Sequence, residues 1–403
     1  MIEILAGTAA GVALGVVSGV LPGIHVNTLA GMMLASLAFL LPIFGPFFLA
    51  AALFSALIAH CFLDAIPSTF LGIPDADTAV AVLPAHALCM EGKGEEAVRI
   101  SALGSVTGLA VAVPLCGLLL VVMPSLQPVL DWGSGVILVA VIGFLLVQSD
   151  SPRWGFLTFF ISGILGIFSF RYSYLAPPLL GEGAVLMPLL SGLFGISILL
   201  YSGKGTIPPQ RFSGLDIHHA GILKGTTLGG IAGLVVGWLP GLSNATANGV
   251  LASAVNYTRD RRGYLLATSA ANTMNAVVGL AAFFAVERTR NGVVAALSMV
   301  ETPSFTLLLV SGTLAALAAY LITIRLAGLA HLLEGVDRTR LNFVVMVFVA
   351  VVSFLSAGLF GIFLLVIATA IGCIPRLVNI PQVFCMGAIM VPVMLYSFGL
   401  GGI

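Results

Sequence analysis

Long runs of apolar residues recur from one end of the chain to the other, separated by short stretches rich in polar residues, glycine or proline. Residues 109–122 and 343–355 are two such runs. A helix of about 17–25 apolar residues crosses about 30 Å of hydrocarbon. Strands of a membrane barrel would instead be about 10 residues long and would alternate in polarity. The pattern therefore predicts an all-α polytopic membrane protein.

Composition supports a lipid environment for these helices. Of the 403 residues, 59% are hydrophobic and only 8% are charged, whereas a soluble domain carries about 25% charged residues. The 16 basic and 16 acidic residues balance, which argues against a nucleic-acid partner because that would need a basic patch. The five cysteines form no CxxC pair, so we interpret them as apolar packing residues. No basic region opens the chain, and no cleaved signal peptide is expected.

One motif occurs twice. The pattern GxxxGxxxGxLPG spans residues 11–23 and again residues 229–241. GxxxG alone is common on packed membrane helices because glycine lets backbones approach closely, but three glycines in register with Leu-Pro-Gly are far more specific. The repeat predicts four regions: a first inverted repeat over 1–130, linking transmembrane helices over 131–217, a second inverted repeat over 218–335 and C-terminal transmembrane helices over 336–403.

Each Leu-Pro-Gly predicts a broken helix. Pro22 and Pro240 remove a backbone donor, and Gly23 and Gly241 permit a sharp bend. Broken backbone at membrane depth is tolerated only inside protein or beside a water-filled cavity. Interrupted segments at matching places in two halves point to a transporter binding site. The simpler interpretation, a plain kink in a packing helix, stays open for either motif alone.

The charges of the loops predict that the two halves are inverted. Residues 91–99 contain Lys93 and Arg99, whereas the counterpart, 300–305, contains only Glu301. Conversely, residues 257–263 hold three arginines and their counterpart, 41–46, holds no charge. Basic loops favour the cytoplasm. We therefore predict a multi-pass protein of the cell membrane with both termini outside, an outer loop at 124–133 and a re-entrant segment over 64–90.

Several segments resemble the TctA family, the large membrane permease subunit of tripartite tricarboxylate transporters. They are residues 15–23, 66–78, 91–94, 239–241 and 270–275. In its length the chain looks like a compact, archaeal-type branch of that family. It departs from the family pattern at Asp75, where glycine is usual, and at 286–292, where a Gly-Ile-Pro-Gly-like turn is usual. The resemblance implies cation-coupled carboxylate uptake, together with a small membrane subunit and an extracytoplasmic binding protein.

A carboxylate carrier needs hydrogen-bond donors and positive helix ends in the membrane. The polar side chains at the two breaks and in the segments that follow can donate to carboxylate oxygens or ligate sodium through their own oxygens. N-capping and hydrogen bonding between helices are the structural alternatives. The candidate substrate-binding residues are Pro22, Gly23, Asn27, Thr28, Ser68, Thr69, Pro240, Gly241, Ser243, Asn244, Thr246, Asn248, Asn272 and Asn275.

Carboxylates inside a membrane are costly and usually functional. Asp75 and Asp77, with Thr78, are therefore the candidate cation-coupling residues, against the alternative of hydrated acids in an interfacial loop. The coupling ion, sodium or a proton, is left open, and no other cofactor or metal is expected. Asp64 is interpreted as a boundary acid at one end of an apolar helix.

Two further pairs of residues are interpreted as structural. His60 and His86 lie in apolar surroundings and are expected to pack with a hydrogen bond. Arg288 and Arg290 are expected to pair with Glu287 and Glu301, although attraction of an anion is the alternative.

These observations together favour a secondary transporter of a small organic anion of the di- or tricarboxylate class, working by alternating access in the lipid bilayer. Two rivals are weighed against it. One is a non-catalytic membrane subunit of a multi-component uptake system, which would not need polar breaks in both halves. The other is an intramembrane enzyme, which is disfavoured because the HExxH and GxSxG signatures are lacking. Homo-oligomerisation is left open.

Overall fold

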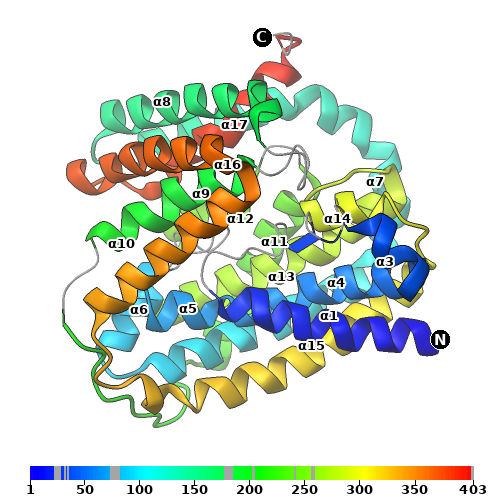
Figure 1. Cartoon of the computed structure of the whole chain (residues 1–403), viewed down its shortest axis with the longest axis horizontal. Coiled ribbons are helices and arrows are strands. Elements are labelled where there is room, and N and C mark those ends of the chain that lie inside the picture. Colours follow the sequence, from blue (N-terminus) through cyan, green and yellow to red (C-terminus); the bar gives the residue numbers. More distant parts are fainter. Residues whose placement is uncertain are drawn as a thin grey trace.

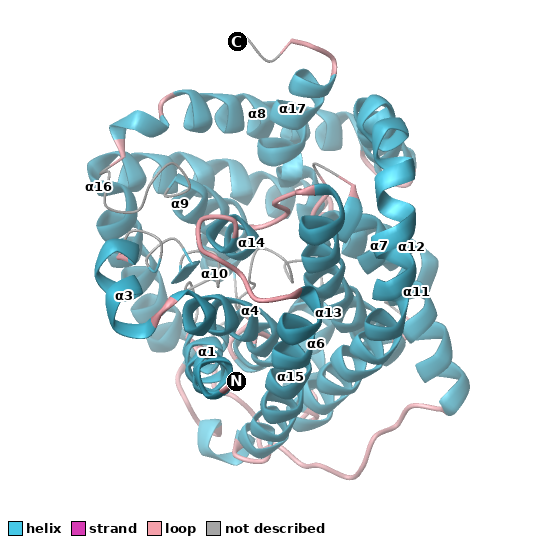
Figure 2. Cartoon of the chain, turned by 90° about the vertical axis from the view of Figure 1, so that its right-hand side faces the viewer, coloured by secondary structure: helices cyan, strands magenta, loops and turns pink. Residues whose placement is uncertain are grey.

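The computed structural model describes residues 1–21, 29–30, 33, 36–72, 82–176, 185–201, 205–239, 242–255 and 259–400. In these ranges the regular structure is helical, apart from one isolated bridge between Thr206 and Asp337. The helices form two layers, which α7 connects along one side (Figure 1). Figure 2 shows the same arrangement from that side, with α8 and α17 at one end and α1 and α15 at the other.

The α-helices up to residue 201 are α1 (Ile2–Val20), α3 (Leu37–Phe44), α4 (Pro46–Leu63), α5 (Ala65–Phe70), α6 (Val82–Met90), α7 (Gly94–Val147), α8 (Pro152–Arg171), α9 (Leu186–Leu190) and α10 (Ser197–Tyr201). Those from residue 219 onward are α11 (His219–Trp238), α12 (Asn244–Val255), α13 (Arg261–Val286), α14 (Gly292–Leu297), α15 (Phe305–Ala327), α16 (Arg338–Val378) and α17 (Gly387–Ser397). Short 3-10 or π segments complete them: η1 (Ser173–Leu175), η4 (Ser191–Ile196), η5 (Ala330–Leu333) and η6 (Gln382–Met386).

Among the described residues, eight helical segments are long and apolar enough to cross a membrane: α1, α4 continued by α5, α7, α8, α11, α13, α15 and α16. Many of their apolar side chains point outward, as at Leu118, Val121 and Leu359. A surface of this kind suits lipid rather than water. The prediction of an all-α polytopic membrane protein is confirmed.

The repeated glycines allow the first helix of each half to lie directly on a neighbour. A Cβ atom added at Gly15 of α1 would lie 2.6 Å from the Cβ of Ala59 on α4. One added at Gly233 of α11 would lie 2.6 Å from the Cβ of Met274 on α13. Any larger residue would separate the helices, so the glycine spacing encodes close packing.

Both first helices end where Leu-Pro-Gly begins. α1 stops at Val20 and Leu21 is extended, with φ −84° and ψ 113°. α11 stops at Trp238 and Leu239 is likewise extended, with φ −77° and ψ 131°. The residue before a proline avoids the helical region because the proline ring clashes with it. The predicted helix ends at these two motifs are present.

Helices of each half also pack against helices of the other half. α7 of the first half packs against α13 of the second, while α15 of the second packs against α4 of the first. Hydrogen bonds follow the same pattern: Thr226 donates to the hydroxyl of Thr107 at 2.8 Å, and the hydroxyls of Thr8 and Ser311 are 2.7 Å apart. Each half therefore completes the core of the other.

The helices of the predicted linking and C-terminal regions form the other layer, and helices of one region pack against helices of the other. α8 packs on α17, and the second part of α16 packs on the α9–α10 segment. A Cβ at Gly192 would lie 2.7 Å from the carbonyl oxygen of Leu365, and one at Gly372 would lie 2.7 Å from the hydroxyl of Ser197. These two regions are thus packing partners in one layer, and the division at 131 and 336 stays a prediction.

The predicted outer loop at 124–133 is wrong, because these residues lie inside the helix α7. α7 has 54 residues, a length of about 81 Å at 1.5 Å per residue, so it greatly exceeds the hydrocarbon thickness. Pro114, Pro124 and Pro128 lie within it, and Gln127 accepts a hydrogen bond from the indole N–H of Trp238 at 2.9 Å.

The other very long helix, α16, is interrupted at Ala357 and Gly358, where glycine accepts a positive φ of 59°.

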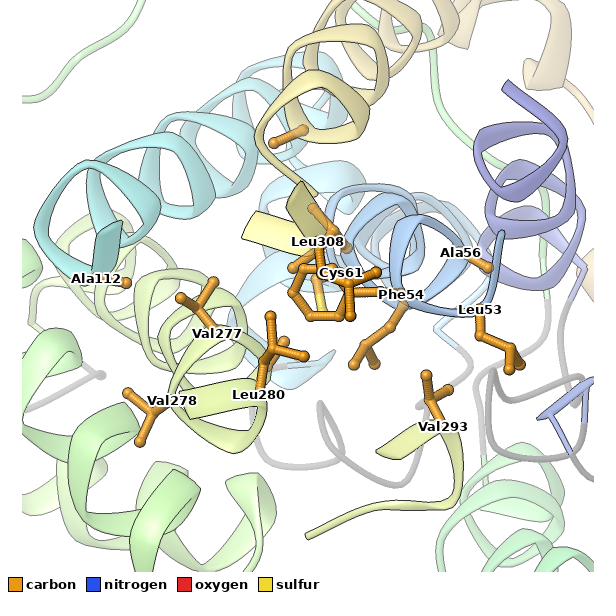
Figure 3. Close-up of a cluster of buried hydrophobic side chains, with 14 of the residues drawn as sticks. Leu53, Phe54, Ala56, Cys61, Ala112, Val277, Val278, Leu280, Val293 and Leu308 are labelled. Carbon is orange, nitrogen blue, oxygen red and sulfur yellow. The ribbon is translucent and has the colours of Figure 1, made fainter. Parts of the chain in front are cut away.

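The largest apolar core lies where α4, α7, α13, α14 and α15 meet. Phe54 of α4 lies toward Val277 and Leu280 of α13 in this cluster, whereas Leu53 lies on the other side of α4 (Figure 3). Leu308 of α15 joins them. Because this core is made from both halves, it holds the two broken helices in a fixed relation.

Candidate functional site

The helix that follows the second break begins with buried polar side chains. Asn244, Thr246 and Asn248, all on α12, are each only 1% exposed. The backbone N–H of Thr246 donates to the hydroxyl of Ser243 at 3.3 Å, and Tyr264 donates to the carbonyl of Asn248 at 2.9 Å. Amide groups and a helix N-terminus together favour negative charge at this end of α12.

A chain of hydrogen bonds runs from this helix start into the first half. Asn244 donates from Nδ2 to Oδ1 of Asn272 at 2.8 Å. Asn272 in turn donates from Nδ2 to Oδ2 of Asp64 at 2.9 Å. The Asn272 amide is thereby oriented at both ends, so the break in the second half is connected with a carboxylate of the first half.

Beside this chain lies a small polar cavity of about 20 Å³, which has room for about one water molecule. Its walls come from both halves. The first half contributes Asp64, Ala65, Ser68, Thr69, Ala85 and Ser101, and the second half contributes Leu265, Thr268, Ser269 and Asn272. Ser68, Thr69 and Asn272 were predicted as site residues, and the structure places all three around this cavity.

Asp64 is the residue that sequence reasoning undervalued. It lies between α4 and α5 in helical conformation, with φ −59° and ψ −22°, and it is only 4% exposed. It thus stands at the end of α4, as the boundary interpretation predicted, but it is buried within an apolar segment that runs on to Phe70. The spacing of His60, Asp64 and Ser68 by four residues, which puts them on one helix face, is the signal that could have revealed it.

The other predicted residues divide into two groups. Asn275 lies on α13 beside the end of α11, where its carbonyl oxygen is 3.1 Å from the position of a Cβ on Gly237. The remaining candidates lie outside the described residues: Pro22, Gly23, Asn27, Thr28, Asp75, Asp77, Thr78, Pro240 and Gly241.

Both histidines make the hydrogen bond expected of packed residues. His60 Nδ1 is 3.1 Å from the hydroxyl of Ser18 on α1, and His86 Nδ1 is 2.9 Å from the carbonyl oxygen of Thr69. The bond of His86 joins α6 to α5. α6 therefore lies against α5.

Two arginines lie near the end of α11, and the predicted pairing with Glu287 and Glu301 is wrong. Arg288 pairs with Asp131 of α7. Arg290 donates to the carbonyls of Val236 at 2.8 Å and Gly237 at 3.2 Å, just before the break. A cation at a helix C-terminus is favourable. Burial lowers the pKa of Arg290 to about 10, so it stays protonated at neutral pH.

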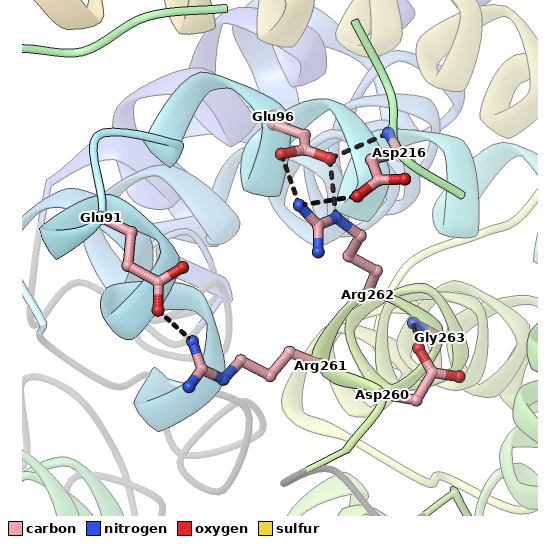
Figure 4. Close-up of polar contacts among 7 residues, drawn as sticks. All are labelled: Glu91, Glu96, Asp216, Asp260, Arg261, Arg262 and Gly263. Carbon is pink, nitrogen blue, oxygen red and sulfur yellow. Dashed lines mark hydrogen bonds and ion pairs between the residues drawn. The ribbon is translucent and has the colours of Figure 1, made fainter. Parts of the chain in front are cut away.

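A charged cluster joins the two halves at the start of α7 and α13 (Figure 4). Arg262 binds Glu96 through two bonds of 2.7 and 3.1 Å, and Arg261 lies 2.5 Å from Glu91. The Glu96 side chain is only 5% exposed. Both segments therefore lie at the same end of the bundle, and the compartment that this end faces stays a prediction.

The fold and site define a class: a multi-pass helical membrane protein with helices broken at matching places in two halves and buried polar groups at the break. The chain belongs to the TctA family, because the model described as "Tripartite tricarboxylate transporter TctA family" matches residues 5–387. It is therefore a component of a transport system.

One relative is the uncharacterized protein MJ1079 of Methanocaldococcus jannaschii. It is 28% identical over 306 residues, which cover 75% of this chain and 72% of that protein. No solved structure matches the chain.

Proposed function

We propose that the chain is a secondary active transporter for a small organic anion of the di- or tricarboxylate class. The observation that carries the proposal is the hydrogen-bonded chain from Asn244 through Asn272 to Asp64. It puts oriented amides at the start of a half-helix, in the protein interior, and connects them to both halves. Structural capping alone would not require a bond that crosses from one half to the other.

The chemistry of this place favours an anion. The N-terminus of α12 offers backbone N–H groups and a partial positive charge, and Ser243, Asn244 and Thr246 add side-chain donors beside it. A bound carboxylate would compete with Asn272 for the amide of Asn244. Family membership supports the same class of substrate.

The packing of the halves supports inverted repeats and alternating access. If the two repeats ran parallel, equivalent ends of their helices would lie on the same side of the bundle and would meet there. Instead, Glu96, in the first turn of the long helix α7 of the first half, meets Arg262, in the first turn of α13 of the second half. Likewise, Leu37 and Leu49, which flank the start of α4, lie around one hollow with Ala296 and Val300, which precede α15. Opposite ends meet at both places, as inversion requires.

Thermal stabilisation of the purified protein tests the proposal. The panel contains mono-, di- and tricarboxylates, each at two pH values, with sodium or choline as the cation. A ligand that binds the folded state raises the unfolding midpoint by mass action. We expect one carboxylate class to raise it, and Asn244→Ala to weaken that binding about tenfold because one charge-assisted bond is lost. Asn27→Ala is expected to weaken it further.

The matched control is Gln148→Ala, which removes an exposed amide and should leave binding unchanged. If no acid shifts the wild-type midpoint, the test is repeated after co-expression with the small membrane subunit and binding protein typical of tripartite systems. Continued absence of a shift would contradict the transporter assignment and favour a non-transporting subunit.

A further inference from the structure

The cavity beside Asp64 is too small for an organic acid, and its walls consist largely of oxygen-bearing side chains. At about 20 Å³ it holds one water molecule or one ion, whereas pockets for organic ligands measure about 300 Å³ or more. It is therefore a different site from the break at Asn244, although Asn272 adjoins both.

The hydroxyl groups around the cavity leave lone pairs available. Ser68 donates its proton to the carbonyl of Asp64 at 2.7 Å, and Thr268 donates to the carbonyl of Leu265 at 3.1 Å. A hydroxyl has one proton and two lone pairs. Both oxygens can therefore still accept a hydrogen bond or ligate a cation.

Thr69 supplies the second, independent indication. Its side chain is fully buried, its residue lines the cavity, and its hydroxyl has no hydrogen-bond partner among the described residues. A buried hydroxyl without a partner costs about 1–3 kcal/mol. Such a group in the wall of an ion-sized cavity requires an explanation, and a bound ligand provides one.

We propose that this cavity binds a sodium ion, which couples to transport of the organic anion; the coupling rests on the proposed function. Asp64 supplies one negative charge, and the hydroxyls of Ser68, Thr69 and Thr268 supply neutral oxygens. Hard cations prefer oxygen ligands, and a single carboxylate balances a monovalent ion. A proton would need only Asp64 and would leave the ring of hydroxyls without a role.

Asn272 gives the site a direct path to the substrate region. Its amide N–H points to Asp64 and its amide oxygen accepts from Asn244. When sodium occupies the cavity, the Asp64 carboxylate is shared between the ion and Asn272. The orientation of Asn272, and with it the amide of Asn244, therefore depends on the ion.

The test is a sodium titration of purified protein in the absence of any organic acid, with choline chloride keeping the ionic strength constant. We expect the unfolding midpoint to rise with sodium concentration in the wild type. Asp64→Asn should abolish the sodium-dependent shift, and Thr69→Val should move its half-saturation at least tenfold higher. Asp150→Asn, at an exposed acid, should retain the wild-type response.

Three results would overturn the sodium site. One is a wild-type midpoint that is equal in sodium and choline. Another is a sodium shift that survives in Thr69→Val and Asp64→Asn but disappears in Asp75→Asn. The third is a midpoint that responds to pH and not to sodium, which would make Asp64 a proton carrier. If Asp64→Asn does not fold, Thr69→Val and Ser101→Ala decide the question. Since no acid is present, failure of the carboxylate panel leaves this test intact.

Discussion

The two halves of the chain share a scaffold but differ in chemistry at one equivalent position. A Cβ at Gly19 would lie 2.6 Å from the Cβ of Leu63, and one at Gly237 would lie 2.7 Å from the Cβ of Val278. The following residue is the buried acid Asp64 in the first half and Gly279 in the second. Packing is thus preserved between the halves, while the charged group is present in one only.

The surroundings of this position also carry opposite charge. Asp64 lies in the polar cavity, whereas the side chains nearest to the corresponding glycine, Gly279, belong to Arg290 and Asn291. Arg290 binds the end of the broken helix α11. The comparison teaches that repetition of the glycine motif specifies how the helices approach, and that the residues beside this shared packing differ between the halves.

The largest effects should come from breaking the shared scaffold. Gly15→Val and Gly233→Val each push a branched side chain into a neighbouring helix, and each should cost about 3 kcal/mol or prevent folding. Gly117→Val, where a Cβ meets no heavy atom within 4 Å, is the control. Thermal unfolding and size-exclusion profiles give the readout. Sensitivity in only one half would show that the scaffold is not shared.

A smaller effect should come from the charged cluster that joins the halves. Arg262→Met leaves Glu96 buried without its cation and should cost about 3 kcal/mol at most, since Arg262 is partly exposed. Arg261→Met removes an exposed pair and should cost about 0–1 kcal/mol. Unfolding midpoints measure both. The double variant Arg262→Met/Glu96→Met should be milder than Arg262→Met alone; a larger loss would contradict an isolated pair.

The smallest effect concerns the hydroxyl pairs that join helices of the two halves. Thr8→Val and Thr226→Val each remove one hydrogen bond between helices while keeping the shape of the side chain. Such bonds are worth about 0.6 kcal/mol in membrane proteins. We expect two small, equal decreases in the unfolding midpoint. Clearly unequal decreases would show that the two pairs are not equivalent.

Much of the fold could be predicted because the relevant signals are local. Apolar runs reveal membrane helices by length, and Pro22 and Pro240 predict where α1 and α11 end. The candidate site was predicted only in part. Ser68, Thr69, Asn244 and Asn272 were chosen as polar residues in unusual places, but nothing in the sequence shows that Asn244 and Asn272 touch.

Sequence alone determined the lipid environment, the helical class and the two breaks, since these depend on hydrophobic length and on the backbone properties of proline and glycine. Tertiary structure decided that Asp64 is buried beside Asn272 and that Arg262 meets Glu96. These contacts join residues 208 and 166 positions apart. Which side chains meet at such separations depends on how whole helices pack, a collective property of both halves that no local pattern records.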